Sequence, residues 1–216
     1  MLRPLGSLAC AVACLPGTLS AVQLMVNGSF DDGLTGWTSQ GAVSESSGFA
    51  LIEEAGVGGT SAVFQSVAVS PDPLVLTFEL YIGGMSTTVP AGLLADTVFG
   101  TIYFGDAAFG NDATSGTFDE QLSLFDLDRD GVREVAPGAS REPIPGRTDW
   151  ERFRVTFSTS RQFATIVVES IDLNGGAAPA SVVAVDQFSL ELVPEPSVLA
   201  LLLPGLLLVF RRARAP

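Results

Sequence analysis

The side chains of this sequence that could perform chemistry are carboxylates, hydroxyls and arginines. The chain has 24 acidic residues and no histidine, and all eleven basic residues are arginine. These counts exclude a Ser-His-Asp or Cys-His relay, a histidine-bound zinc ion and a Schiff-base lysine. Both cysteines, Cys10 and Cys14, lie near the N-terminus. A mature chain cut after that leader therefore has neither a disulfide nor a thiol nucleophile.

One group of carboxylates has the spacing of a calcium loop. Asp126, Asp128 and Asp130 alternate before Gly131, and they match the first three ligands and the glycine of an EF-hand-like loop. Position twelve is Pro137 in place of the bidentate glutamate, which excludes a complete EF-hand. The apolar strand residues that precede this group also fit an acidic hairpin tip in solvent. Both interpretations stay open at this point.

Paired carboxylates could also serve a glycosidase or a lyase. Two adjacent pairs are the candidates, Asp31 with Asp32 and Glu53 with Glu54. Adjacent residues on a strand point to opposite faces, so neither pair is a natural catalytic dyad. We therefore expect a non-catalytic protein, and a secreted carboxylate-dependent glycosidase or lyase is the alternative.

The charge of the body restricts its partners. Residues 22–197 contain all 24 acidic residues and seven of the arginines, which gives a net charge of −17. Such a surface repels nucleic-acid phosphates and anionic lipids, and it suits divalent cations or neutral partners. Acidity also keeps an exported protein soluble, whatever it binds. We expect no nucleic-acid partner.

The elements that must position these residues are short strands. Residues 74–82 alternate, with large apolar side chains on one face and polar residues such as Thr77 and Glu79 on the other. Residues 150–157 repeat this pattern. Glycine, proline and Asn/Asp clusters separate the strands, which predicts an all-β fold, an antiparallel β-sandwich or jelly roll, with a loop at 141–148. Further strands are predicted at 23–26, 49–53, 62–69, 97–104, 121–127, 164–170 and 182–192.

The two edges of this body carry a family resemblance. Residues 24–37, Leu-Met-Val-Asn-Gly-Ser-Phe-Asp-Asp-Gly-Leu-Thr-Gly-Trp, resemble the first strand and turn of galactose-binding-like jelly rolls, the fold of many carbohydrate-binding modules. Asp186 lies on the matching closing strand, although Gln187 stands where a second acidic residue or an asparagine is common. The resemblance implies polysaccharide binding. We expect Trp37 to be a core residue rather than a sugar platform.

The closing strand also suggests a metal site. Asp186 shares the alternation of Phe188 and Leu190, so without a bulge it points into the core, where it needs a cation or a hydrogen-bond donor. Resemblance to calcium-bearing jelly rolls pairs it with Asp31, helped by backbone oxygens near Asn27, and implies a structural Ca²⁺. Alternatively, Asp186 only accepts backbone N–H bonds. We rank this site above the alternating aspartates.

The N-terminal end has the anatomy of a secretory signal peptide. Residues 1–21 combine one positive charge, an apolar stretch at 5–15 and a Pro-Gly break before small residues. Cleavage is expected near Ser20 or Ala21. A retained anchor and lipoprotein processing at Cys14 are weaker alternatives, because the apolar run is short and the usual leucine before such a cysteine is absent.

The C-terminal end, residues 193–216, has a Pro-Glu-Pro motif, an apolar run at 198–210 and a final arginine cluster. In this order, the three parts resemble a PEP-CTERM sorting signal, a tail also called an ice-binding protein C-terminal domain. The resemblance implies processing by an exosortase and transfer to the cell surface or extracellular matrix. The apolar helix would reach about 20 Å, which is short of a bilayer core of about 30 Å, so we expect a transient membrane span. The motif residues are Pro194, Glu195, Pro196, Arg211, Arg212 and Arg214.

The basic C-terminus would stay in the cytoplasm and leave the body outside. A permanent anchor is the alternative, and a GPI signal is disfavoured because it would end in apolar residues. The sequence thus predicts a cleavable signal helix at 1–21, a β-sandwich domain at 22–192 and a sorting tail with a short hydrophobic helix at 193–216. The expected function is that of an exported surface or matrix protein whose body binds extracellular polysaccharide.

Overall fold

The computed structural model describes residues 22–56, 59–89, 91–111, 117–173 and 180–193, and these residues form twelve strands. The predicted signal peptide and residues 194–216 of the predicted tail lie outside them. Val22–Glu195 form one compact unit. Among the residues described, no helix is long and apolar enough to cross a membrane.

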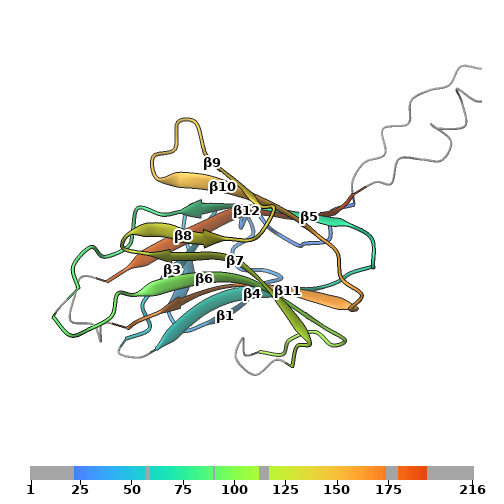
Figure 1. Ribbon diagram of the computed structural model, residues 1–216, viewed down its shortest axis with the longest axis horizontal. Helices are drawn as coiled ribbons and strands as arrows, with labels where there is room; N and C mark the ends of the chain where they lie inside the picture. The colour runs from blue at the N-terminus through green and yellow to red at the C-terminus, as the bar shows by residue number, and fades with distance from the viewer. Residues whose placement is uncertain (1–21, 57–58, 90, 112–116, 174–179, 194–216) are drawn as a thin grey trace, which may run out of the picture. The chain divides into compact units, whose positions relative to one another are not determined.

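The twelve strands form two six-stranded antiparallel sheets that pack face to face (Figure 1). This arrangement confirms the predicted all-β sandwich of the jelly-roll type. The first sheet, here called the β5 sheet, has the order β2 (Val43–Glu45), β3 (Ala50–Glu53), β12 (Val182–Leu192), β5 (Leu74–Tyr81), β10 (Trp150–Phe157) and β9 (Ser140–Pro143). The second, the β6 sheet, has the order β1 (Thr38–Gln40), β4 (Thr60–Ala68), β11 (Phe163–Ile171), β6 (Thr97–Gly105), β7 (Glu120–Asp128) and β8 (Gly131–Val135).

The alternation of the strands builds the core between the sheets. On β5, Leu76, Phe78 and Leu80 are buried, while the residues between them face outward. Phe78 stacks on Phe153 of β10 with ring centroids 5.0 Å apart, and on Phe188 of β12 at 5.2 Å. Full burial of each such side chain is worth about 1.5–3 kcal/mol. The central strands are therefore fixed by their apolar faces.

Trp37 is a core residue, as expected. Its side chain is 8% exposed and packs against Phe30 and Phe188, with centroid distances of 5.0 and 4.9 Å. The indole nitrogen donates a hydrogen bond to the carbonyl oxygen of Asn27 at 3.0 Å. Trp37 thus closes one part of the core and offers no exposed ring for a sugar.

Some predicted strand positions were wrong. Residues 23–26 form no strand, and Gln23 makes an isolated bridge to Glu191 because the chain turns at Asn27, which has a φ of 49°. Four short strands, β1, β2, β8 and β9, were not predicted, and β9 occupies part of the expected loop at 141–148. These strands lie at or beside the sheet edges and bury few side chains, so their sequences lack a clear apolar alternation.

Candidate functional site on the outward face of the β5 sheet

The outward face of the β5 sheet carries an aromatic row. Trp150, the first residue of β10, lies opposite Tyr81, the last residue of β5, with ring centroids 5.8 Å apart. Phe49 packs edge-on against Trp150 at 5.7 Å. In the loop between β9 and β10, Arg147 places its guanidinium carbon 3.7 Å from the centroid of the Trp150 ring, a cation–π contact. The row therefore combines apolar rings with hydrogen-bond donors.

A charged row lies next to it on the same face. Glu79 of β5 is 4% exposed, and its carboxylate accepts hydrogen bonds from Arg147 and, at 2.7 Å, from Arg152 on the neighbouring strand. Asp186 of β12 pairs with Glu79 in the strand register and lies 3.6 Å from Arg147. Arg147 therefore joins two buried carboxylates to the ring of Trp150.

Asp186 faces outward, which corrects the prediction that it points into the core. A β-bulge follows it, where the pairing between β12 and β5 shifts by one residue and Gln187 adopts a φ of 53°. The extra residue reverses the alternation, so that Phe188 is buried in the core while Asp186 shares a face with Glu79. The prediction assumed a regular strand.

Asp186 has both a donor and a positive neighbour. Burial is the largest effect on this carboxyl and raises its pKa, and the negative charge of Glu79 acts in the same direction. The backbone N–H of Gln187, 2.7 Å from the carboxylate, and the charge of Arg147 lower the pKa. Arg147 thus places a positive charge beside this carboxylate.

A third row on this face consists of hydroxyls and one arginine. In the strand register, Arg154 of β10 pairs with Ser140 of β9 on one side and with Thr77 of β5 on the other. Thr77 in turn pairs with Ser189 of β12. Arg154 is exposed and forms no ion pair within the described part of the chain. Its guanidinium donors are therefore open to a ligand.

The other two predicted calcium residues, Asn27 and Asp31, lie in the turn that precedes Trp37. The side-chain amide of Asn27 donates to the carbonyl oxygens of Gly33 and Thr35, at 2.8 and 3.1 Å. Asp31 accepts a hydrogen bond from the Ser29 hydroxyl at 2.7 Å. The turn reaches the bulge through backbone, where the N–H of Phe188 donates to the carbonyl of Gly28 at 2.9 Å, and through the ring of Phe30, whose centroid lies 6.3 Å from that of Phe188.

The alternating aspartates form a hairpin tip, one of the two interpretations that the sequence left open. Asp128 ends β7, and Gly131 begins β8 with a φ of 96°. Asp128 is 5% exposed, accepts from the N–H of Asp130 at 2.8 Å and pairs with Arg133 at 2.5 Å. Burial and the charge of Asp128 raise the pKa of Asp126. Over all described residues, no group of three or more His, Cys, Asp or Glu side chains is placed to hold a metal ion.

Glu54, one of the candidate catalytic carboxylates, joins a cluster at one end of the sandwich. Its carboxyl is hydrogen-bonded to Asp96, accepts from the N–H of Ser181 and lies near Asp172. Burial, above all, and these carboxylates raise the pKa of Glu54 to about 7. A direct hydrogen bond brings the Glu54 and Asp96 carboxyls closer than the roughly 5 Å of a retaining glycosidase pair. Glu53, its neighbour, is exposed on β3.

Sequence reasoning missed Asp96 and Asp172, although a signal was present. Asp96 directly precedes the predicted strand 97–104, and Asp172 closely follows the predicted strand 164–170. When two antiparallel strands pair, the start of one lies beside the end of the other. The pairing of β6 with β11 therefore brings both aspartates to one end of the sheet.

Comparisons with known proteins give likenesses in fold over about four fifths of the chain. No family model and no curated protein matches the sequence. Among solved structures, the carbohydrate-binding module TmCBM61 in complex with β-1,4-galactotriose is 11% identical, covers 80% of this chain and 99% of its own, and has a TM-score of 0.46. A CBM4 structure is 13% identical with coverages of 78% and 99% and a TM-score of 0.43. A Stig cyclase from Fischerella sp. TAU is 16% identical with coverages of 81% and 99% and a TM-score of 0.43. At these scores no function transfers, so the assignment of the site depends on its own residues.

Proposed function

We propose that the body binds a neutral polysaccharide, without catalysis, on the outward face of the β5 sheet. The observation that supports this function is that three rows of side chains lie next to one another on one face. They are the aromatic rings of Tyr81 and Trp150, the ion pairs around Glu79, and the hydroxyl row with Arg154. Aromatic rings offer apolar area for the C–H face of a sugar, and fixed polar groups select its hydroxyls. The net charge of −17 in residues 22–197 disfavours an anionic chain.

Affinity electrophoresis tests this function. The protein is run through gels that contain a galactan, a xylan, a β-glucan or a polyuronate, and we expect retardation by at least one neutral chain. Tyr81→Ala and Arg154→Gln should each weaken the retardation. Tyr103→Ala is the control, because Tyr103 lies on β6, in the other sheet, where its ring stacks on Phe109. The proposal would be contradicted if the protein ran equally fast in gels with and without every polysaccharide. It would also be contradicted if Tyr103→Ala lost as much retardation as the two site variants.

The rival function is hydrolysis or elimination on a polysaccharide. Glu54 supports it through its raised pKa, although its hydrogen bond to Asp96 is a poor geometry for a glycosidase pair. Incubation of the purified protein with the same polysaccharides tests it. Release of reducing or unsaturated ends that disappears in Glu54→Gln would replace binding by catalysis.

We also propose that the chain is exported and sorted through its Pro-Glu-Pro tail, with an exosortase as the processing partner. The support is the three-part order of residues 194–214, together with the signal-peptide anatomy of residues 1–21. Intact mass spectrometry of the surface fraction is the test. The mature mass should lack both ends, and a mass that still includes Arg211 to Pro216 would contradict the sorting.

Calcium binding at Asp31 and Asp186 remains a prediction. The donors and the arginine around Asp186 weaken the need for it, because the charge of this carboxylate is already compensated. Thermal melts in millimolar calcium and in EGTA test the prediction, since a ligand that binds only the folded state raises the melting temperature. Coincident melts would remove calcium without affecting the polysaccharide proposal.

A further inference from the structure

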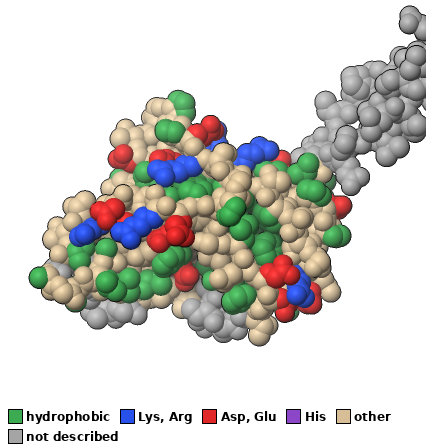
Figure 2. Space-filling model, in the orientation of Figure 1, with side chains coloured by type: hydrophobic (Ala, Val, Ile, Leu, Met, Phe, Trp, Pro, Cys, Tyr) green, Lys and Arg blue, Asp and Glu red, His purple; other side chains and the backbone are tan. Residues whose placement is uncertain are grey.

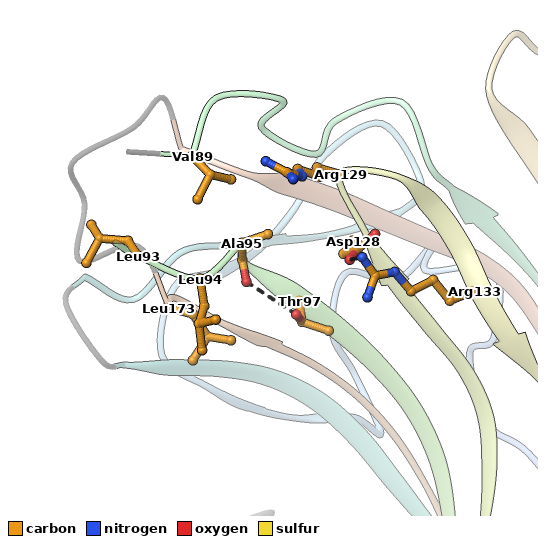
Figure 3. Close-up of a pocket in the computed structure, with 9 residues that line it drawn as sticks. All are labelled: Val89, Leu93, Leu94, Ala95, Thr97, Asp128, Arg129, Arg133 and Leu173. Atoms are coloured by element: carbon orange, nitrogen blue, oxygen red, sulfur yellow. Dashed lines mark hydrogen bonds and ion pairs between the residues drawn. The ribbon is translucent and has the colours of Figure 1, made fainter. Parts of the chain in front are cut away.

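A cleft with a volume of about 530 Å³ opens on the side of the molecule formed by the β6 sheet (Figure 3). Its walls come from the segment that leads into β6 and the first residue of that strand, from Leu173, two residues after the end of β11, and from the hairpin of β7 and β8. The volume lies within the range of small-molecule sites. None of the three rows on the β5 sheet contributes to the lining, so this cleft is separate from the proposed polysaccharide face.

One wall of the cleft is apolar and unusually open. Leu94 is 67% exposed, Leu93 43% and Leu173 39%, and Val89 lies near them. Figure 3 shows Leu93, Leu94 and Leu173 together on the side of the cleft away from Arg133. Exposed apolar side chains that gather at one concave place are uncommon in the absence of a ligand or partner. These leucines offer a surface for an apolar chain or ring.

The opposite wall is polar and held in place. Asp128 is 5% exposed and pairs with Arg133 at 2.5 Å, which fixes that arginine over the end of β7. Arg129 is less engaged: its nearest acidic partner, Asp130, lies 3.7 Å away and is itself 60% exposed. Such an exposed pair contributes little. In Figure 3 the side chain of Arg129 points toward the side of the cleft on which Val89 lies.

The charge of the lining is opposite to that of the body. One carboxylate and two guanidinium groups line the cleft, a net charge of +1, whereas residues 22–197 carry −17. Figure 2 shows basic and acidic side chains alternating over the hairpin of β7 and β8. A single negative group can be held here by Arg129, and a polyanion would be repelled by the rest of the surface.

We propose that this cleft binds an amphipathic monoanion, a small molecule with an apolar chain or ring and a single carboxylate or sulfonate. The apolar part lies on Leu93, Leu94 and Leu173, and the anionic group accepts hydrogen bonds from Arg129. Arg133 keeps its ion pairs with Asp128 and Asp130 and lines the polar side. Because the two walls face each other, the ligand must carry its charge at one end and its apolar surface at the other.

Displacement of the fluorescent monoanion 8-anilinonaphthalene-1-sulfonate by octanoate tests the site on the full chain. Octan-1-ol, with the same apolar chain and no charge, is the comparison ligand. We expect saturable displacement, with octanoate about tenfold stronger than octan-1-ol, the value of one charge-assisted hydrogen bond. Arg129→Gln should remove this difference and leave octan-1-ol unchanged. Leu94→Ser should weaken both ligands severalfold.

Two matched variants lie outside the cleft and should change neither ligand. Arg154→Gln removes the same charge from an exposed strand position, and Val26→Ser alters an apolar side chain that is 58% exposed elsewhere. Displacement that is unaffected by Leu94→Ser would place the dye on another apolar part of the chain and overturn the proposal. The proposal would also be overturned if Arg129→Gln and Arg154→Gln weakened octanoate binding equally, or if the dye showed no saturable binding.

Discussion

Replacing Glu54 with glutamine should make the folding stability of the protein less dependent on pH. Glu54 is the partly buried member of a carboxylate cluster, where Asp96 is 3% exposed and Asp172 is 1% exposed. The Ser181 hydroxyl donates to Asp96 at 2.9 Å, and its N–H donates to Glu54. The groups that shift the pKa of Glu54 are these carboxylates and this amide, with no arginine among them. A proton on Glu54 is therefore what allows it to hydrogen-bond to Asp96.

The sign of the effect follows from the raised pKa. Burial first, then the hydrogen bond to Asp96 and the nearby negative charges, raise the pKa of Glu54 from 4.5 to about 7. The folded state then binds this proton more tightly than the unfolded state. The stabilisation is complete below pH 4.5, falls as the pH rises and is lost above about pH 7. Each tenfold change in proton affinity is worth about 1.4 kcal/mol, so the rise from 4.5 to about 7 sets an upper limit of about 3.5 kcal/mol. Because Glu54 is only partly shielded from water, we expect about 1.5 kcal/mol.

Urea unfolding between about pH 4.5 and pH 8, in the presence of EGTA, measures this effect. The free energy of unfolding of the wild type should fall by about 1.5 kcal/mol more than that of Glu54→Gln across this range. Glutamine does not titrate, and its amide can donate to Asp96 as a protonated glutamate does. Glu53→Gln is the control, because Glu53 is exposed on β3 and should leave the wild-type slope unchanged. If the free energies of unfolding of the wild type and Glu54→Gln changed in parallel with pH, the proton on Glu54 that bonds to Asp96 would be refuted.

Two further substitutions test the ion pairs and the close backbone contact around the bulge. Arg147→Met should destabilise the fold by about 2 kcal/mol at pH 8, because it leaves the buried carboxylates of Glu79 and Asp186 undercompensated. The loss should be smaller at pH 4, because burial raises the pKa of Asp186 and a protonated Asp186 needs no positive neighbour. Urea unfolding at both pH values measures this, and Arg154→Met, without an ion pair to a described residue, should be nearly neutral. Gly28→Ala should destabilise by about 2 kcal/mol or more, because a Cβ there collides with the backbone oxygen of Phe188. Thermal melts check this value against Gly110→Ala, where nothing lies within 4 Å of the added Cβ and a change below about 0.5 kcal/mol is expected.

The central strands could be predicted because each has one face that must be buried. The alternation on 74–82 and 150–157 is strong enough that β5 and β10 differ little from the expected ranges. The edge strands β2, β8 and β9 have mostly exposed side chains, so nothing in their sequence marks them apart from loops. They exist because a neighbouring strand offers unpaired backbone groups, which is a property of the sheet rather than of the segment.

The candidate site was less accessible to sequence reasoning, because its members come together through register. Trp150 and Tyr81 are the first residue of one strand and the last of another, and only the pairing of β10 with β5 places them side by side. Arg147 lies in a loop that folds over this face, and no motif links it to Glu79 or Asp186. The requirement that Asp186 have a cation or a donor was a sound inference, since burial still raises its pKa.

The positive charge that Asp186 meets depends on a single backbone feature, the β-bulge that follows this residue. Alternation assigns a face to each residue only while the strand is regular, and one extra residue reverses every assignment on one side of it. The bulge after Asp186 turns its carboxylate from the core to the outward face, where an arginine from the loop can reach it. In the core this carboxylate would have needed a cation or a hydrogen-bond donor, whereas on the outward face the chain itself supplies both, through Arg147 and the N–H of Gln187. Gln187, the departure noted from the resembled jelly rolls, is the residue at which this occurs: its positive φ makes the bulge, and its N–H supplies the hydrogen bond.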